Sequence, residues 1–104
     1  MTIKKMAAGR TEPGKTDWRV YEFKGSKGLV LDVDTRAAGF AGTPLYFTSM
    51  GGTAGHWATT GATSIYSPTK VGFRIYVRWV NGNPLTPKDA NDREWHINWY
   101  GIES

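Results

Sequence analysis

The stretch GFRIYVRWV, residues 72–80, limits the possible folds of this chain more than any other feature. Its apolar positions are Phe73, Ile75, Val77 and Trp79. Its polar positions are Arg74, Tyr76 and Arg78. Because successive side chains of a β-strand point to opposite faces, this alternation predicts a strand with one face in a core. The other face carries two arginines and a tyrosine, and its role is the main functional question that the sequence raises.

Two other stretches alternate in the same way and predict strands with one buried face. Residues 29–34 place Leu29, Leu31 and Val33 opposite Val30, Asp32 and Asp34. Residues 94–103 place Trp95, Ile97 and Trp99 opposite His96, Asn98 and Tyr100. Clusters of glycine and other turn residues bound shorter strand candidates at 18–23, 44–50 and 64–67.

One helical candidate stands among these strands, at residues 85–92. Thr86 is a suitable N-cap, Pro87 suits the first helical position, and Asp89 lies in the first turn, where the helix dipole favours an acid. The pattern therefore predicts an all-β fold: a small antiparallel β-sandwich of about six strands, with at most one short helical turn.

The length of 104 residues suits one domain with a single core. Residues 1–16 are polar, contain glycine and proline, and lack a period, so they predict a flexible N-terminal arm. Residues 17–104 are then expected to form a single β-sandwich domain. Five tryptophans and thirteen glycines agree with many short strands joined by turns.

Composition narrows the chemistry. The chain has no cysteine and only two histidines, His56 and His96, so we expect neither a metal nor a cofactor. Much of the net charge of +4 comes from the first fifteen residues, and in residues 73–79 only Tyr76 shares a face with arginine; both observations argue against nucleic acid. The chain contains no apolar run long enough for a signal peptide or a bilayer span, which is consistent with a cytoplasmic protein or export by a non-classical route.

Three segments together resemble a known family. TPLYFTS (43–49), VGFRIYV (71–77) and INWYGI (97–102) are similar to the recurring strands of the H-type lectins, which include snail agglutinins and slime-mould discoidins. The resemblance covers about residues 28–102, and it departs from the family where Tyr100 or Gly101 replaces a closing alanine. It implies a six-stranded sandwich that binds galactose or N-acetylgalactosamine as an oligomer, with sites near subunit boundaries.

Sugar recognition requires planar hydrogen-bonding groups and an aromatic face. The residues with this chemistry on the expected strands and loops are Asp34, Arg36, Arg74, Tyr76, Arg78, His96, Asn98 and Tyr100. If the strands at 72–80 and 94–103 pair, their polar faces form one surface. The loop that contains His56 and Trp57 is a second place where an indole is available to a ligand.

Two other interpretations of the arginine face remain open. Arg74 and Arg78 can pair across strands with Asp32 and Asp34, or the face can be a subunit interface, where arginine and tyrosine are enriched.

From the resemblance and from these residue types we predict a non-catalytic, carbohydrate-binding (lectin-like) module that recognises galactose-type glycans as a symmetric homo-oligomer, a trimer or larger. The alternative is a structural or receptor-binding oligomerisation module. An enzyme is not expected, because the chain lacks a catalytic motif.

Overall fold

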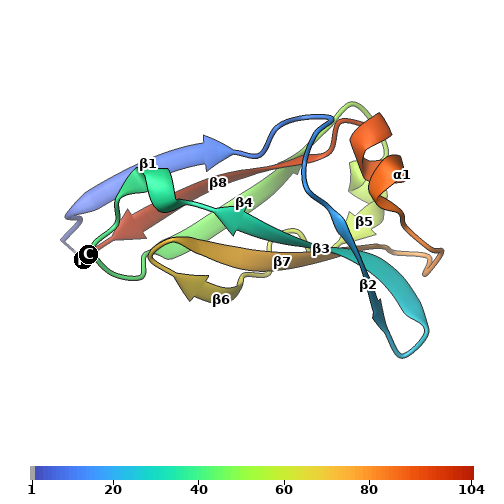
Figure 1. Cartoon of the computed structure of the whole chain (residues 1–104), viewed down its shortest axis with the longest axis horizontal. Helices are drawn as coiled ribbons and strands as arrows, with labels where there is room; N and C mark the ends of the chain where they lie inside the picture. Colours follow the sequence, from blue (N-terminus) through green and yellow to red (C-terminus); the bar gives the residue numbers. More distant parts are fainter. Residues whose placement is uncertain (1) are drawn as a thin grey trace.

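The computed structural model describes residues 2–104 and shows an all-β chain (Figure 1). Within these residues eight strands and one short α-helix occur, together with 3₁₀ turns at Arg36–Ala38 and His56–Ala58. The elements are β1 (Lys5–Arg10), β2 (Arg19–Phe23), β3 (Ser26–Asp34), β4 (Leu45–Gly51), β5 (Thr59–Thr60), β6 (Tyr66–Thr69), β7 (Gly72–Trp79), α1 (Pro87–Asp92) and β8 (His96–Glu103). The predicted all-β class is confirmed.

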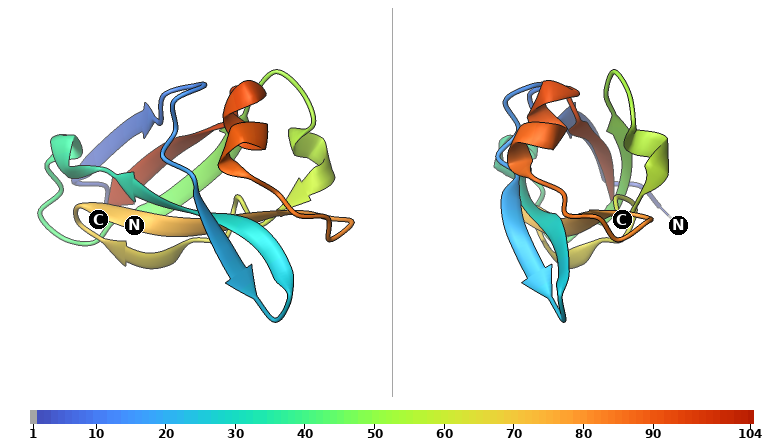
Figure 2. Two further views of the ribbon diagram at one scale, coloured as in Figure 1. Left: turned by 45° about the vertical axis from the view of Figure 1, so that its right-hand side comes forward. Right: turned by 90° about the vertical axis from the view of Figure 1, so that its right-hand side faces the viewer.

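The strands form two antiparallel sheets. In the three-stranded sheet β8 lies between β1 and β4. The five-stranded sheet has the order β2-β3-β7-β5, and β6 also pairs with β7. The two sheets form the layers of a sandwich-like arrangement, which Figure 2 shows from two further directions. The predicted sandwich is therefore confirmed, with β1 and β5 added to the six expected strands.

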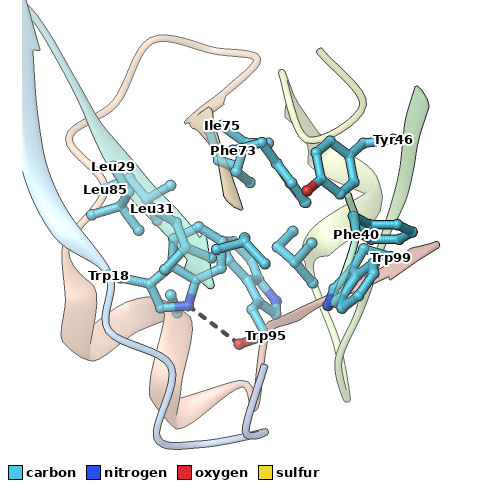
Figure 3. Close-up of a cluster of buried hydrophobic side chains, with 14 residues drawn as sticks. Trp18, Leu29, Leu31, Phe40, Tyr46, Phe73, Ile75, Leu85, Trp95 and Trp99 are labelled. Atoms are coloured by element: carbon cyan, nitrogen blue, oxygen red, sulfur yellow. Dashed lines mark hydrogen bonds between the residues drawn. The ribbon is translucent and has the colours of Figure 1, made fainter. Parts of the chain in front are cut away.

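The core lies between the two sheets and uses the apolar faces that alternation predicts (Figure 3). The expected core residues Leu31, Phe73, Ile75, Val77 and Ile97 are each at most 3% exposed. The whole cluster comprises Trp18, Leu29, Leu31, Val33, Phe40, Tyr46, Phe73, Ile75, Val77, Leu85, Ala90, Trp95, Ile97 and Trp99. Burial of these apolar surfaces is the main force that holds the sheets together.

Trp95 joins three separate segments of the chain. Its indole Nε1 donates to the Ala54 carbonyl at 2.8 Å, and its own carbonyl accepts from Trp18 Nε1 at 3.2 Å (dashed line in Figure 3). Its ring also meets Trp79 edge to face, at 5.2 Å between centroids. The polar atoms of these buried indoles are thus satisfied, as burial requires.

Part of the segment that we predicted as a flexible arm, residues 1–16, forms a regular strand; residue 1 lies outside the described residues. Lys5–Arg10 form strand β1, which pairs with β8 from Lys5 opposite Glu103 to Arg10 opposite Asn98. Strand β1 lacks the large apolar residues that mark a buried face, because the side chains on its inward face must be small. A Cβ at Gly9 would come within 2.9 Å of the Trp99 ring.

The predicted helix is confirmed as α1. The Thr86 hydroxyl accepts from the Asp89 amide at 3.1 Å, and the Asp89 carboxylate accepts from the Thr86 amide at 3.1 Å. This reciprocal capping box and Pro87 in the first turn account for the start of the helix. At six residues α1 falls far short of a bilayer's thickness, and nowhere in residues 2–104 is there a helix long and apolar enough to cross a membrane.

The β2–β3 hairpin projects from the body of the sandwich (Figures 1 and 2). Its turn, Lys24–Gly25, has positive φ at both positions, 51° and 81°. Such a turn matches the right-handed twist of the strands and favours glycine at the second position. All five residues of β2 are exposed, so the hairpin forms a raised wall beside the outer face of β7.

The core assignment predicts that Ile75→Ala destabilises the fold by roughly 2–5 kcal/mol, because Ile75 is fully buried between the sheets. Val20→Ala, at a strand position that is 60% exposed, is the matched control and should change stability by less than about 0.5 kcal/mol. Denaturant unfolding measures both. Equal midpoints for the two variants would contradict the assignment.

Candidate functional site

The predicted polar residues of β7 and β8 lie on opposite sides of the molecule. β8 pairs with β1 and β4, whereas β7 pairs with β3, β5 and β6. Both strands turn their apolar residues toward the shared core, so their polar faces point away from each other. The single surface that would follow from pairing of these two strands therefore does not form, and Arg74, Tyr76 and Arg78 are separated from the β8 residues.

Arg74 makes the cross-strand pair that we considered as the alternative. Its Nε donates to Asp32 Oδ1 at 2.7 Å and its Nη2 to Asp32 Oδ2 at 3.0 Å. Arg19 Nη2 donates to the same carboxylate at 2.5 Å. These bonds, chiefly the two from Arg74, hold the pKa of Asp32 below its ordinary value, and Asp32 in turn raises the pKa of Arg74. Arg74 thus connects strands β3 and β7 through two N–H donors, and its charge is paired with Asp32.

Asp34 and Arg36 form an ion pair at the C-terminal end of β3. The Asp34 carboxylate accepts from the Arg36 amide at 2.8 Å and from Arg36 Nη1 at 3.3 Å. Both residues line a hollow of about 450 Å³, together with Arg74, Ser67 and Thr69. This hollow brings together three predicted residues, but their charged groups are already partnered.

A larger groove, of about 580 Å³, crosses the outer face of the five-stranded sheet. Tyr76 is at its centre, and two tyrosines from other segments pack against it. The Tyr21 ring lies 4.7 Å from the Tyr76 ring between centroids, and the Tyr66 ring lies 5.0 Å away in an edge-to-face arrangement. The lining residues are Tyr21, Phe23, Ser26, Gly28, Leu29, Thr60, Gly61, Ser64, Tyr66, Tyr76, Val77 and Arg78.

Two glycines give the groove its shape. A Cβ at Gly28 of β3 would come within 2.6 Å of the Val77 carbonyl oxygen and 3.3 Å of the Arg78 Cβ. Gly61 has φ +108°, and a Cβ there would come within 2.1 Å of the Tyr76 carbonyl oxygen. Each glycine lets its backbone approach β7 closely. At these two positions, therefore, no side chain lies between the backbone and β7.

Of the predicted residues, only Tyr76 and Arg78 line this groove. Residue chemistry alone missed Tyr21, Phe23 and Tyr66, which are 38%, 58% and 51% exposed. The available signal was in β2, where Arg19, Tyr21 and Phe23 alternate with Val20 and Glu22. Each face of β2 thus carries both polar and apolar residues. The pattern therefore does not indicate which face of this strand points toward the core.

The remaining predicted residues lie outside the groove. On β8, His96 Nδ1 is 2.9 Å from the Glu94 carbonyl oxygen, Asn98 Nδ2 donates to Ser49 Oγ at 3.3 Å, and Tyr100 stacks on Phe47 at 4.9 Å between centroids. Trp57 is 90% exposed in the 3₁₀ turn that precedes β5. Its neighbour His56 is partly buried, with an Nδ1 atom that lacks a protein partner.

The groove offers aromatic faces, hydroxyl groups and one guanidinium, and its lining contains neither a carboxylate nor a histidine. These groups suit binding better than proton transfer. Residues 2–104 bring together no cluster of three or more His, Asp or Glu side chains that could hold a metal ion.

Comparisons of the chain with models of protein families, with curated proteins and with solved structures found no match.

The two pairs that Asp32 makes predict that Asp32→Asn destabilises the fold by roughly 1 kcal/mol at neutral pH, since exposed pairs each contribute up to about that amount. The folded-state pKa of Asp32 lies below its value in an unfolded chain, about 3.9. The stabilisation is therefore complete above that value and is lost as the pH falls below it.

Urea unfolding of the parent and of Asp32→Asn, between neutral pH and pH about 2, measures this difference. The gap should close in acid. Asp17→Asn, at an exposed aspartate outside the ion pairs of residues 2–104, is the control and should leave stability nearly unchanged. A gap that stays constant across the whole pH range would show that the Asp32 charge contributes nothing.

Proposed function

We propose that this chain is a carbohydrate-binding module. Its sugar site is the groove of about 580 Å³ around Tyr21, Tyr66 and Tyr76, which we call the tyrosine groove. The observation that carries the proposal is the cluster of Tyr21, Tyr66 and Tyr76 beside Arg78 on one outer sheet face. A pyranose ring has an apolar C–H side, which packs on aromatic rings, and a rim of hydroxyls, which pair with planar donors. The volume of about 580 Å³ falls in the usual range for small-ligand sites, roughly 300–1,000 Å³.

Galactose-type sugars are the class that we propose. The axial hydroxyl of galactose gathers the polar groups on one side of the ring and leaves a continuous apolar patch on the other. Such a patch suits tyrosines that are held at fixed angles by their neighbours. The resemblance of residues 28–102 to H-type lectins supports the same class.

We further infer that the module binds without catalysis. Glycoside hydrolysis requires two carboxyl groups on either side of the scissile bond. The groove lining contains only neutral side chains and Arg78, and the nearest acid on this face, Asp32, pairs with Arg19 and Arg74. A bound sugar would therefore meet neither a general acid nor a nucleophile.

Tyr66→Ala should weaken sugar binding by about tenfold, equivalent to about 1.4 kcal/mol, because it removes one aromatic wall of the groove. Tyr100→Ala is a closely matched control: this tyrosine is also exposed on a strand and packs on one aromatic partner, but it lies on the opposite sheet. A glycan array identifies the ligand, and calorimetry with a monovalent sugar gives affinities for both variants. Binding that is lost equally in both, or in neither, would argue against the groove.

The second candidate is an oligomerisation module, and a specific surface favours it. Six apolar residues lie side by side on the outer side of the three-stranded sheet. We call them the apolar face: Met6, Ala8, Leu45, Phe47, Tyr100 and Ile102. Met6, Leu45 and Phe47 are 58%, 52% and 44% exposed. Neighbouring exposed apolar side chains of this kind often mark an interface.

A second copy of the chain is the occupant that we propose for the apolar face. None of these six residues is charged, and Arg10 lies at the edge of the face, next to Ala8 on the same side of β1. Pairing the six residues with those of a second copy therefore buries apolar surface on both without desolvating a charge among them. The groove lies on the opposite sheet and would remain accessible in such an assembly. Sugar binding and self-association are therefore compatible functions of one module.

Phe47→Lys should shift the chain toward monomer, because it places a charge within the apolar face, beside Tyr100 of the central strand. Analytical ultracentrifugation of the parent and the variant measures this change. Val20→Lys, at an exposed apolar position on the other sheet, is the control and should assemble like the parent. A parent that sediments as a monomer at high concentration would contradict the proposal for the apolar face.

A further inference from the structure

Arg78 differs from the other arginines on the same sheet face in what lies opposite it. Arg74 faces Asp32 across the strands, and Arg19 reaches the same carboxylate. Arg78 pairs with Thr60 of β5, and on its other side a Cβ at Gly28 would lie 3.3 Å from the Arg78 Cβ; neither neighbour carries a charge. Among residues 2–104 the ion pairs involve the carboxylates of Asp32, Asp34, Asp89 and Asp92, and Arg78 takes part in none of them.

The surroundings of Arg78 favour an anion. It is the one charged side chain among the residues that line the groove, and the rest are aromatic, hydroxyl-bearing, aliphatic or glycine. Lys24 Nζ lies 5.3 Å from the centroid of the Phe23 ring at the hairpin end, which adds a second positive charge nearby. Glu22, the acid of β2, alternates with Tyr21 and Phe23 and so lies on the other face of that strand.

We propose that the groove takes an acidic saccharide: a galactose-type ring whose exocyclic carbon carries a carboxylate, as in a uronic acid. This inference rests on the proposed function and adds the ligand's charge. The ring packs on Tyr76 and its neighbours, and the carboxylate accepts two parallel N–H bonds from the Arg78 guanidinium.

The spacing along β7 suits this arrangement. Tyr76 and Arg78 are two residues apart on one face, a separation of about 7 Å for an extended strand. That distance is comparable with the width of a pyranose ring and its exocyclic group. Both side chains line one continuous groove, so a single acidic sugar can contact both at the same time.

The test compares an oligogalacturonate with the neutral galactose oligomer of the same length, by calorimetry at low and at high salt. The parent should bind the acidic oligomer about tenfold more tightly at low salt, and the preference should shrink as salt screens the charge. Arg78→Gln should abolish the preference, because a neutral amide can still pair with a hydroxyl but offers no charge to a carboxylate; the neutral oligomer should still bind. Arg78→Lys should lose most of the preference, because an ammonium cannot form the fork. The neutral oligomer is thus an internal control for folding.

Arg74→Lys is the matched control, since it keeps the charge on the same face of the same strand but changes a residue already paired with Asp32. It should leave the preference intact. Equal affinity of the parent for both oligomers, or a preference that survives in Arg78→Gln, would overturn the acidic-ligand inference and leave the sugar site standing. Failure to bind either oligomer would overturn both.

Discussion

Two aromatic contacts between the sheets determine where the polar side chains of this molecule lie. Tyr46 of the three-stranded sheet packs on Phe73 of the other at 4.6 Å between centroids, and Trp95 meets Trp79 at 5.2 Å. These contacts draw the apolar faces of β4, β7 and the segment leading into β8 into one core. Once those faces point inward, alternation forces the polar residues of each sheet outward, in opposite directions. The result is a sandwich with two different surfaces, a tyrosine groove on one side and an apolar face on the other.

Local periodicity is enough to predict the inner faces of β3, β7 and β8 and the capped helix. Ile75 and Ile97 could be assigned to the core from alternation alone, and Thr86 and Asp89 have the spacing of a capping box. Strand pairing could not be predicted in this way, because a period of two says which face is buried and nothing about which strand is adjacent. Strand β1 escaped detection for a related reason: the Trp99 ring occupies the space above Gly9, so that strand cannot carry the large apolar residues that reveal a strand.

The candidate site likewise depends on which strands are adjacent, and alternation along one strand does not reveal this. Arg74 and Arg78 are equivalent in the sequence pattern, but Asp32 lies opposite the first and Gly28 lies beside the second. The first therefore connects two strands, whereas the second is left beside the aromatic groove with its donors available. The groove itself combines Tyr21, Tyr66 and Tyr76 from three segments, and only the fold brings them together. Residue type does not distinguish the two arginines, and only their neighbours in the fold show which one is engaged in an ion pair.

Amide chemical shifts, followed by ¹H–¹⁵N NMR during titration with a galactose-type oligosaccharide, test the central claim that the groove is the sugar site. The account predicts that the shifts concentrate in the three segments that form the groove, near Tyr21 to Gly28, Thr60 to Tyr66 and Tyr76 to Arg78. The amides of Asn98 and Tyr100, on the outer face of the opposite sheet, should stay unchanged. Shifts centred on β8 or on the His56–Trp57 turn, or unchanged spectra at millimolar ligand, would contradict it.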